Sequence, residues 1–168
     1  MSKILLIGPS GVGKSSALSL LAENTELETY DVDDLIKTDP ARIAKIEEST
    51  DWPKLYFQYT KEIIENMNSN KLLIFAIGAG SIEYTRGHTW YYNKKVILLS
   101  GKPEIIYPRS NRQLFHPTYE SYKSIEFSEA RKKFYQKFHQ RINVNSLSSK
   151  EVVVRILNII PFVENKNQ

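Results

Sequence analysis

The 168-residue sequence has no cysteine and no long hydrophobic run. Without cysteine, disulfide bonds and thiolate metal sites are excluded, and the absence is typical of proteins of the reducing cytoplasm. No apolar run approaches the ~20 residues that a membrane-spanning helix needs. The first apolar segment starts almost at the N-terminus, so we expect no signal peptide. The sequence therefore predicts a cytoplasmic protein with no membrane partner.

A strong charge of one sign is also lacking. The net charge is +4, with 23 basic against 19 acidic residues. The basic residues are spread along the chain apart from Arg131-Lys132-Lys133, a run that on a helix is usually a solvated face. No basic patch or stripe is evident, so we expect no nucleic-acid partner. With 41% hydrophobic residues, we expect one globular domain over residues 1–168, acting as a monomer.

Five apolar segments alternate with segments of helical character. The predicted strands are Lys3–Ile7, Leu27–Asp31, Leu72–Ile77, Val96–Ser100 and Ile142–Val144. The predicted helices are Lys14–Glu23, Pro40–Glu48, Leu55–Asn68, Pro103–Tyr107, Ser128–Arg141 and Ser149–Ile160. Ser148 and Glu151 form a capping box ahead of the last helix. This alternation predicts an α/β fold of three layers around a five-stranded parallel sheet.

The loop after the first predicted strand is rich in glycine and ends in a lysine and a serine. Gly8-Pro9-Ser10-Gly11-Val12-Gly13-Lys14-Ser15 is a complete G-x-x-x-x-G-K-[ST] motif between a strand and a helix. In such a loop the backbone N–H groups cradle phosphates, the lysine reaches the β- and γ-phosphates, and the serine hydroxyl binds Mg²⁺. We therefore predict that the chain binds a nucleoside triphosphate with Mg²⁺. The expected nucleotide-binding residues of the loop are Gly11, Val12, Gly13, Lys14, Ser15 and Ser16.

Three acidic residues, Asp31, Asp33 and Asp34, follow the second predicted strand. Because the ends of parallel strands meet at one sheet edge, we expect Asp31 beside the Mg²⁺ held by Ser15. Asp33 would project past the metal, where a carboxylate can accept the proton of an acceptor hydroxyl during phosphoryl transfer. Asp34 is a rival for that role. Alternatively, Asp33 or Asp34 only caps a helix that begins near Leu35.

The end of the third predicted strand has no acidic residue. It leads into Gly78-Ala79-Gly80-Ser81, without the metal-binding acid and the glutamate of a motor ATPase. The Asn-Lys-x-Asp motif of GTPases is also missing, since Asn93-Lys94-Lys95-Val96 contains no aspartate. The small residues bring bare backbone close to the sheet edge, where we expect it to contact a small acceptor. A plain tight turn is the alternative.

The stretch from Arg109 to Lys123 mixes basic, aromatic and polar residues without helical periodicity. Over a phosphate-binding loop, such a segment typically closes on the nucleotide, excludes water and brings arginines to the phosphates. We therefore predict a lid at about residues 109–124. The alternative is a surface loop whose arginines meet solvent.

The order of these motifs resembles that of the shikimate kinases, small P-loop enzymes that phosphorylate a polyhydroxy cyclohexene carboxylate with ATP. The resemblance runs nearly end to end. After the P-loop come Asp-x-Asp at 31–33, a Gly-rich turn at 78–80, a lid element at 112–115 and Arg-x-x-x-Tyr at 131–135. It implies a P-loop kinase fold that uses ATP and Mg²⁺.

The resemblance also implies a role for each matching residue. Asp31 would serve the metal together with Ser15, and Asp33 would serve the substrate hydroxyl. Arg109 would stack on the adenine. The implied catalytic residues are Lys14, Asp33 and Arg112, the last of which would approach the transferring phosphate. The implied acceptor-binding residues are Asp33, Gln58, Gly78, Ala79, Gly80 and Arg131, the last of which would hold the substrate carboxylate.

Two positions depart from the family pattern. Gln58 stands where the family has an arginine that completes the carboxylate clamp, and a neutral amide does not replace a charge-assisted bidentate contact. Ala79 replaces the middle glycine of the turn and adds a methyl group where backbone would approach the acceptor ring. These changes leave the fold and the ATP chemistry intact, but they put the identity of the acceptor in doubt.

The sequence therefore predicts a kinase that transfers a phosphoryl group from ATP to a hydroxyl of a small polar, anionic metabolite, with shikimate as the leading candidate. A nucleoside monophosphate kinase is an alternative that the P-loop allows but the Asp-x-Asp motif does not favour. A non-catalytic nucleotide-binding regulatory protein is another. That alternative gains support if Asp33 and Arg131 do not converge on a cavity beside Ser15.

Overall fold

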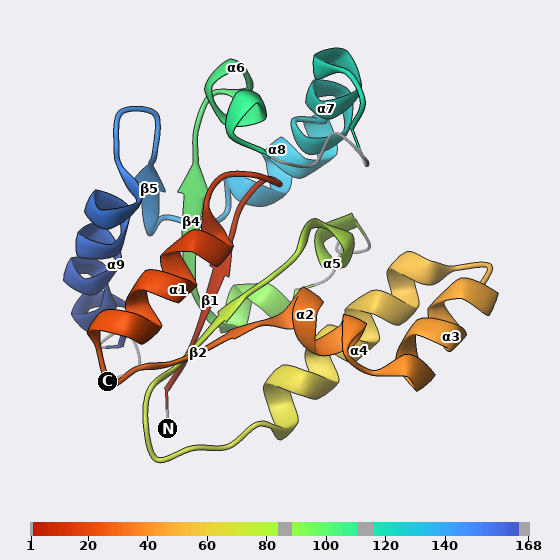
Figure 1. Cartoon of the computed structure of the whole chain (residues 1–168), viewed down its shortest axis with the longest axis horizontal. Helices are drawn as coiled ribbons and strands as arrows, with labels where there is room; N and C mark the ends of the chain where they lie inside the picture. Colours follow the sequence, from red (N-terminus) through yellow and green to blue (C-terminus); the bar gives the residue numbers. More distant parts are fainter. Residues whose placement is uncertain (1, 84–88, 111–115, 165–168) are drawn as a thin grey trace.

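The computed structural model describes residues 2–83, 89–110 and 116–164, and its centre is a parallel sheet (Figure 1). The strands are β1 (Lys3–Ile7), β2 (Glu28–Asp31), β3 (Leu73–Ala76), β4 (Lys95–Ser100) and β5 (Arg141–Asn143). They pair in the order β2-β3-β1-β4-β5, and every neighbouring pair is parallel. The predicted α/β fold with a five-stranded parallel sheet is confirmed.

Helices cover both faces of the sheet and give the three predicted layers. They are α1 (Lys14–Asn24), α2 (Val32–Lys37), α3 (Pro40–Glu48), α4 (Trp52–Asn66), α5 (Ala79–Glu83), α6 (Pro103–Ile106), α7 (Tyr119–Glu126), α8 (Glu129–Tyr135) and α9 (Ser149–Glu164), with 3-10 turns η1 (Trp90–Asn93) and η2 (Tyr107–Arg109). None of the helices in the described ranges is long and apolar enough to cross a membrane.

Alternating side chains along each strand divide the core in two. In β1, Ile4 and Leu6 pack with α1 and α9, whereas Leu5 and Ile7 pack with α2, α4 and α8. Figure 1 shows α1 and α9 to one side of the sheet and α2, α3 and α4 to the other. The inner strands β1, β3 and β4 are therefore apolar at nearly every position, as expected of strands buried on both faces, whereas the edge strands β2 and β5 are more polar.

The acidic residues after β2 begin a helix. Asp31 caps α2, because its Oδ1 atom accepts the backbone N–H of Asp33 at 3.1 Å. The expected helix start near Leu35 is therefore three residues too late, and the cap is neither Asp33 nor Asp34. As a result, Asp31 and Asp33 are held in a fixed relation on the first turn of a helix.

Two more segments are helical against the expectation of irregular structure, namely α5 after β3 and α7 in the predicted lid. Thr118 explains the start of α7, because its hydroxyl accepts the backbone N–H of Ser121 at 3.1 Å. Conversely, α8 ends at Tyr135 and not at Arg141 as expected. The Nη2 atom of Arg141 donates to the carbonyl oxygens of Tyr135 and Phe138, at 3.2 and 2.7 Å, as the chain turns into β5.

The predicted capping box ahead of α9 is confirmed. The Ser148 hydroxyl accepts the N–H of Glu151 at 3.2 Å, and the Glu151 carboxylate accepts the N–H of Ser148 at 2.7 Å. This fixes the start of the helix that packs beside α1 behind the P-loop.

Candidate active site

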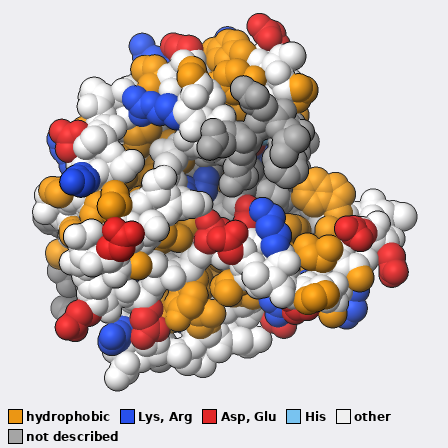
Figure 2. Space-filling view, in the orientation of Figure 1, with side chains coloured by type: hydrophobic (Ala, Val, Ile, Leu, Met, Phe, Trp, Pro, Cys, Tyr) orange, Lys and Arg blue, Asp and Glu red, His pale blue; other side chains and the backbone are white. Residues whose placement is uncertain are grey.

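The carboxyl ends of β1, β2 and β3 open onto one cavity of about 260 Å³. Because β1 lies between β3 and β4, its end is the switch point at which ligands bind in open α/β sheets. Figure 2 shows a hollow in this face of the molecule, with acidic and basic side chains at its edge. The cavity is lined by Ser10, Gly11, Gly13, Lys14, Ser15, Ser16, Asp31, Asp33, Ala76, Ile77, Gly78, Arg109 and Ser110.

The P-loop curves around one side of this cavity. Gly11 and Gly13 have φ angles of 82° and 104°, in the left-handed region that favours glycine. A Cβ atom on Gly11 would also overlap the side chain of Ser110, which closes over the loop from the end of η2. Gly13 directly precedes α1, so the positive end of the helix dipole lies at the cavity.

Lys14 lies inside the cradle that this loop forms. Its side chain is buried, and its Nζ atom donates to the carbonyl oxygens of Gly8 at 2.8 Å and Pro9 at 3.1 Å. These two carbonyl oxygens thus hold the ammonium group at the edge of the cavity. Phosphate oxygens could take their place as hydrogen-bond acceptors.

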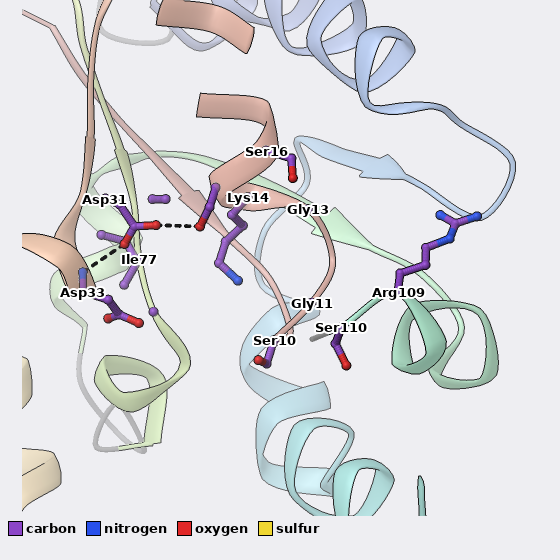
Figure 3. Close-up of a pocket in the computed structure, with 13 residues that line it drawn as sticks. Ser10, Gly11, Gly13, Lys14, Ser16, Asp31, Asp33, Ile77, Arg109 and Ser110 are labelled. Atoms are coloured by element: carbon purple, nitrogen blue, oxygen red, sulfur yellow. Dashed lines mark hydrogen bonds between the residues drawn. The ribbon is translucent and has the colours of Figure 1, made fainter. Parts of the chain in front are cut away.

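Ser15 and Asp31, the two predicted metal ligands, are adjacent. The Ser15 hydroxyl donates to Asp31 Oδ2 at 2.6 Å (Figure 3). Mg²⁺ prefers oxygen ligands and usually keeps several waters and phosphate oxygens, so one hydroxyl and one carboxylate fit it. Across the described ranges, no cluster of three or more His, Cys, Asp or Glu side chains offers an all-protein metal cage. The pair is therefore suited to Mg²⁺ bound together with a nucleotide.

Asp33 faces the same cavity and is 8% exposed. Its Oδ1 atom accepts a hydrogen bond from the Tyr56 hydroxyl at 2.7 Å. A Cβ atom on residue 78 would overlap the Asp33 carboxylate, so Gly78 provides the space that this carboxylate occupies. Asp34 is exposed and does not line the cavity.

Arg109 and Ser110 border the cavity from the other side. Arg109 is exposed, and its Nη1 atom donates to the carbonyl oxygen of Val144 at 3.5 Å. In Figure 3 its side chain extends away from the P-loop, towards the segment that follows β5. The guanidinium group is thus outside the phosphate cradle.

Some predicted site residues are not brought to the cavity. Val12 packs in the core beneath the P-loop, and Gln58 is exposed on α4. Gly80 lies near the rings of Trp52 and Tyr56. Ala79 is the first residue of α5. Among the described residues, four predicted site residues do not line the cavity, namely Val12, Gln58, Gly80 and Arg131. Arg112 lies outside the residues that the structure describes.

Arg131 is buried in an ion pair within the protein. Its Nη1 atom donates to Glu126 Oε2 at 2.5 Å. Burial alone raises the pKa of Glu126, but Arg131, the backbone N–H of Ser10 and the charge of Lys14 together lower that pKa below its ordinary value. Glu126 is therefore ionised and balances the charge of Arg131. Of the two residues expected to form the acceptor wall, Asp33 lines the cavity and Arg131 does not.

Three residues at or near the site, Tyr56, Ser110 and Glu126, did not follow from the sequence. Tyr56 belongs to no motif, although it lies one turn after Trp52 on the face of α4 that packs against α5. Ser110 is an ordinary serine between two arginines. Glu126 carried a weak signal, because it lies four residues after Tyr122 and would share a helix face with it.

The comparisons with known proteins agree with this fold. The family model described as shikimate kinase matches residues 10–161. None of the curated proteins matches the chain. The shikimate kinase of Bacteroides thetaiotaomicron superposes with a TM-score of 0.70 at 19% identity, covering 95% of this chain and 98% of that one. The shikimate kinase of Acinetobacter baumannii, in complex with shikimate, gives 0.69 at 19% identity and covers 100% of this chain and 96% of that one.

A gluconokinase of Sinorhizobium meliloti is also similar, with a TM-score of 0.56 at 18% identity and coverage of 98% of this chain and 94% of that one. At these identities, the solved structures establish the fold and not the acceptor. The family match spans most of the sequence, including the P-loop residues from Ser10 onwards and the Asp-x-Asp motif. The chain belongs to the shikimate kinase family, and it is a small-molecule kinase, a phosphotransferase with an alcohol acceptor.

Proposed function

We propose that this kinase uses ATP and Mg²⁺ to phosphorylate a hydroxyl group of a small polyhydroxylated metabolite, and that shikimate is its leading acceptor. The observation that carries the proposal is the arrangement of three residues at one cavity. The Ser15 hydroxyl lies 2.6 Å from Asp31 Oδ2, and Asp33, on the first turn of α2, lines the same cavity. The family match supports shikimate as the acceptor.

In this proposal the P-loop binds the phosphates and Lys14 stabilises the charge that develops on them. Ser15 and Asp31 would hold Mg²⁺, which would neutralise negative charge on the phosphates. These groups already surround the cavity. Arg109 is proposed to contact the base, and Arg112 the transferring phosphate.

Asp33 is the proposed general base. Its carboxylate accepts a hydrogen bond from Tyr56, which leaves the other oxygen for the acceptor hydroxyl. Because Gly78 has no side chain, this carboxylate can lie close to the backbone at position 78. Tyr56 thereby orients the base, and Asp33 takes the proton as the hydroxyl oxygen bonds to the γ-phosphorus of ATP and the bond from this phosphorus to ADP breaks.

The carboxylate of shikimate is proposed to bind near Arg131. Because Arg131 pairs with Glu126, the acceptor would share this guanidinium with a protein carboxylate. Gln58 is exposed and supplies no second charge. We therefore expect weak ground-state binding of shikimate, seen as a high KM, together with normal use of MgATP.

A panel of acceptors in a coupled ADP-release assay tests the proposal. The panel contains shikimate, gluconate, a nucleoside monophosphate and an uncharged polyol, each with MgATP. We expect ADP release that depends on shikimate and exceeds the rate without acceptor. Faster turnover of another acceptor would reassign the substrate. Tight MgADP binding without acceptor-dependent ADP release would favour a nucleotide-binding regulatory protein.

A further inference from the structure

One buried carboxylate joins three segments that flank the P-loop. Glu126, the last residue of α7, is 2% exposed. Its Oε2 atom accepts the backbone N–H of Ser10 at 3.0 Å and the Nη1–H of Arg131 at 2.5 Å. Its Oε1 atom lies 3.1 Å from the Nε2 atom of His116. The P-loop, the start of α8 and the segment before α7 therefore meet at a single side chain.

The same helix also holds the other backbone group of Ser10. The hydroxyl of Tyr122 donates to the Ser10 carbonyl oxygen at 2.6 Å, and Tyr122 is fully buried. Tyr122 and Glu126 are four residues apart, so they lie on one face of α7. Ser10 is thus fixed through both its N–H and its C=O group. Because Gly11 follows directly, α7 sets the orientation of the peptide groups that begin the phosphate cradle.

The charges at this junction depend on one another. The buried Glu126 is ionised because Arg131, the Ser10 N–H and Lys14 stabilise its negative charge. Removing one partner of such a buried carboxylate destabilises the folded protein, because an uncompensated charge remains buried. A shift of the P-loop, such as phosphate binding would cause, therefore changes the environment of Arg131 through an atom that both contact.

We infer that Glu126 is a positioning residue that couples the nucleotide-binding loop to α8, so that a nucleotide on the P-loop fixes the position of Arg131. The inference deepens the proposed function, because it rests on Arg131 lying next to the acceptor. The coupling itself requires only nucleotide binding. It would give the enzyme an ordered response, in which nucleotide binding prepares the acceptor side.

The first test measures the affinity for MgADP by calorimetry, without any acceptor. Glu126→Gln keeps the shape of the side chain and an oxygen for the Ser10 N–H, but it loses the charge that holds Arg131. We expect about tenfold weaker MgADP binding at unchanged stoichiometry, within the range usual for coupled sites. The control is Glu129→Gln on α8, whose side chain is 78% exposed, and it should bind MgADP like the wild type.

The sign of the change separates positioning from simple charge repulsion. Removing a negative charge near the phosphates strengthens MgADP binding if Glu126 acts only through its charge. Unchanged or tighter binding in Glu126→Gln would therefore overturn the inference. Tyr122→Phe removes the second tie to Ser10 without changing any charge, so it should weaken MgADP binding as well. If Glu126→Gln does not fold, Tyr122→Phe carries both this measurement and the next.

The second test follows hydrogen exchange of the backbone amides in residues 129–135. In the wild type, saturating MgADP should slow exchange in α8. In Glu126→Gln at saturating MgADP, this slowing should be lost while exchange in the P-loop remains slow. Equal slowing of α8 in both proteins, or none in the wild type, would overturn the coupling. Neither readout uses turnover, so failure of every acceptor would reject the proposed function and leave this inference standing.

Discussion

The nucleotide half of the candidate site, residues 8–16, and the proposed acceptor half, formed by Asp33, Tyr56, Gly78 and Arg131, are built in different ways. The nucleotide half is one continuous stretch that supplies the glycines, the lysine and the helix start of the cradle. The proposed acceptor half would take its residues from α2, α4, α8 and the end of β3, and Arg131 is engaged in an internal ion pair. A local motif thus contains the groups of its site, whereas a site assembled from distant elements depends on their packing.

The largest effect is expected from Asp33→Asn, which breaks the acceptor half alone. Losing the general base should lower kcat by ~10²–10⁴-fold. Affinity for MgADP should change little, because the residue faces the acceptor. Steady-state kinetics together with calorimetry measure both quantities. Asp34→Asn is the matched comparison, and a greater loss there would move the base by one residue.

Lys14→Ala breaks the nucleotide half. The ammonium group stabilises charge on the phosphates, so its loss should lower kcat/KM for MgATP by roughly 10²–10³-fold. The midpoint of thermal unfolding should stay close to that of the wild type. Lys45→Ala, at an exposed position on the outlying helix α3, controls for a general loss of positive charge. Unchanged turnover in Lys14→Ala would contradict the role of the P-loop.

Gly78→Ala tests whether the missing side chain at position 78 gives the Asp33 carboxylate the room it needs to act as the base. The added methyl group would overlap the Asp33 carboxylate and push it away, which should cost on the order of a hundredfold in kcat. A smaller loss is expected for Gly80→Ala, whose Cβ would lie in ordinary contact with the rings of Trp52 and Tyr56, at 3.4 Å. Equal losses in the two variants, measured under saturating MgATP, would reject this role of Gly78.

Gln58→Arg should strengthen binding of the acceptor instead of removing a group from the acceptor half. A second cation should lower the KM for shikimate by about tenfold, at the low end for hydrogen bonds to charged groups because position 58 is exposed. The KM for MgATP should not move. Gln58→Lys, which offers a charge without the planar guanidinium, should recover less. An unchanged KM for shikimate in Gln58→Arg would indicate a different acceptor.

The smallest effect is expected from a change at the start of α9, which should leave both halves of the site intact. Ser148→Ala removes the capping box of α9 and should lower the free energy of unfolding by about 1 kcal/mol, as measured by denaturant titration. Neither the affinity for MgADP nor the KM of the acceptor should change. A change in either would mean that the start of α9 acts on the site, contrary to the comparison above.

The strands and the P-loop could be predicted because their signals are local. Apolar runs define β1, β3 and β4, and the motif contains the glycines, the lysine and the serine of the phosphate cradle. The start of α2 at Val32 could not be predicted, because three neighbouring acids can each act as a cap. The helix α7 depends on a single threonine cap and on the burial of Tyr122, which only the packed structure reveals.

The buried ion pair of Arg131 could not be predicted from the sequence for a related reason. Arg131 and Glu126 are close in sequence, but their pair is buried only because α7 and α8 fold against the P-loop. The resemblance to shikimate kinases implies that this arginine binds the acceptor, and that role stays a prediction. Tyr56 was missed because nothing in α4 distinguishes it from its aromatic neighbours until Asp33 is placed beside it.

The most direct measurement is the product of one reaction, with wild-type protein, MgATP and shikimate analysed by mass spectrometry and ADP quantitation. The account predicts a phosphate ester of shikimate in an amount equal to the ADP formed, and neither product with Asp33→Asn beyond the background. ADP without a phosphorylated acceptor, or equal ester formation by the wild type and Asp33→Asn, would contradict it.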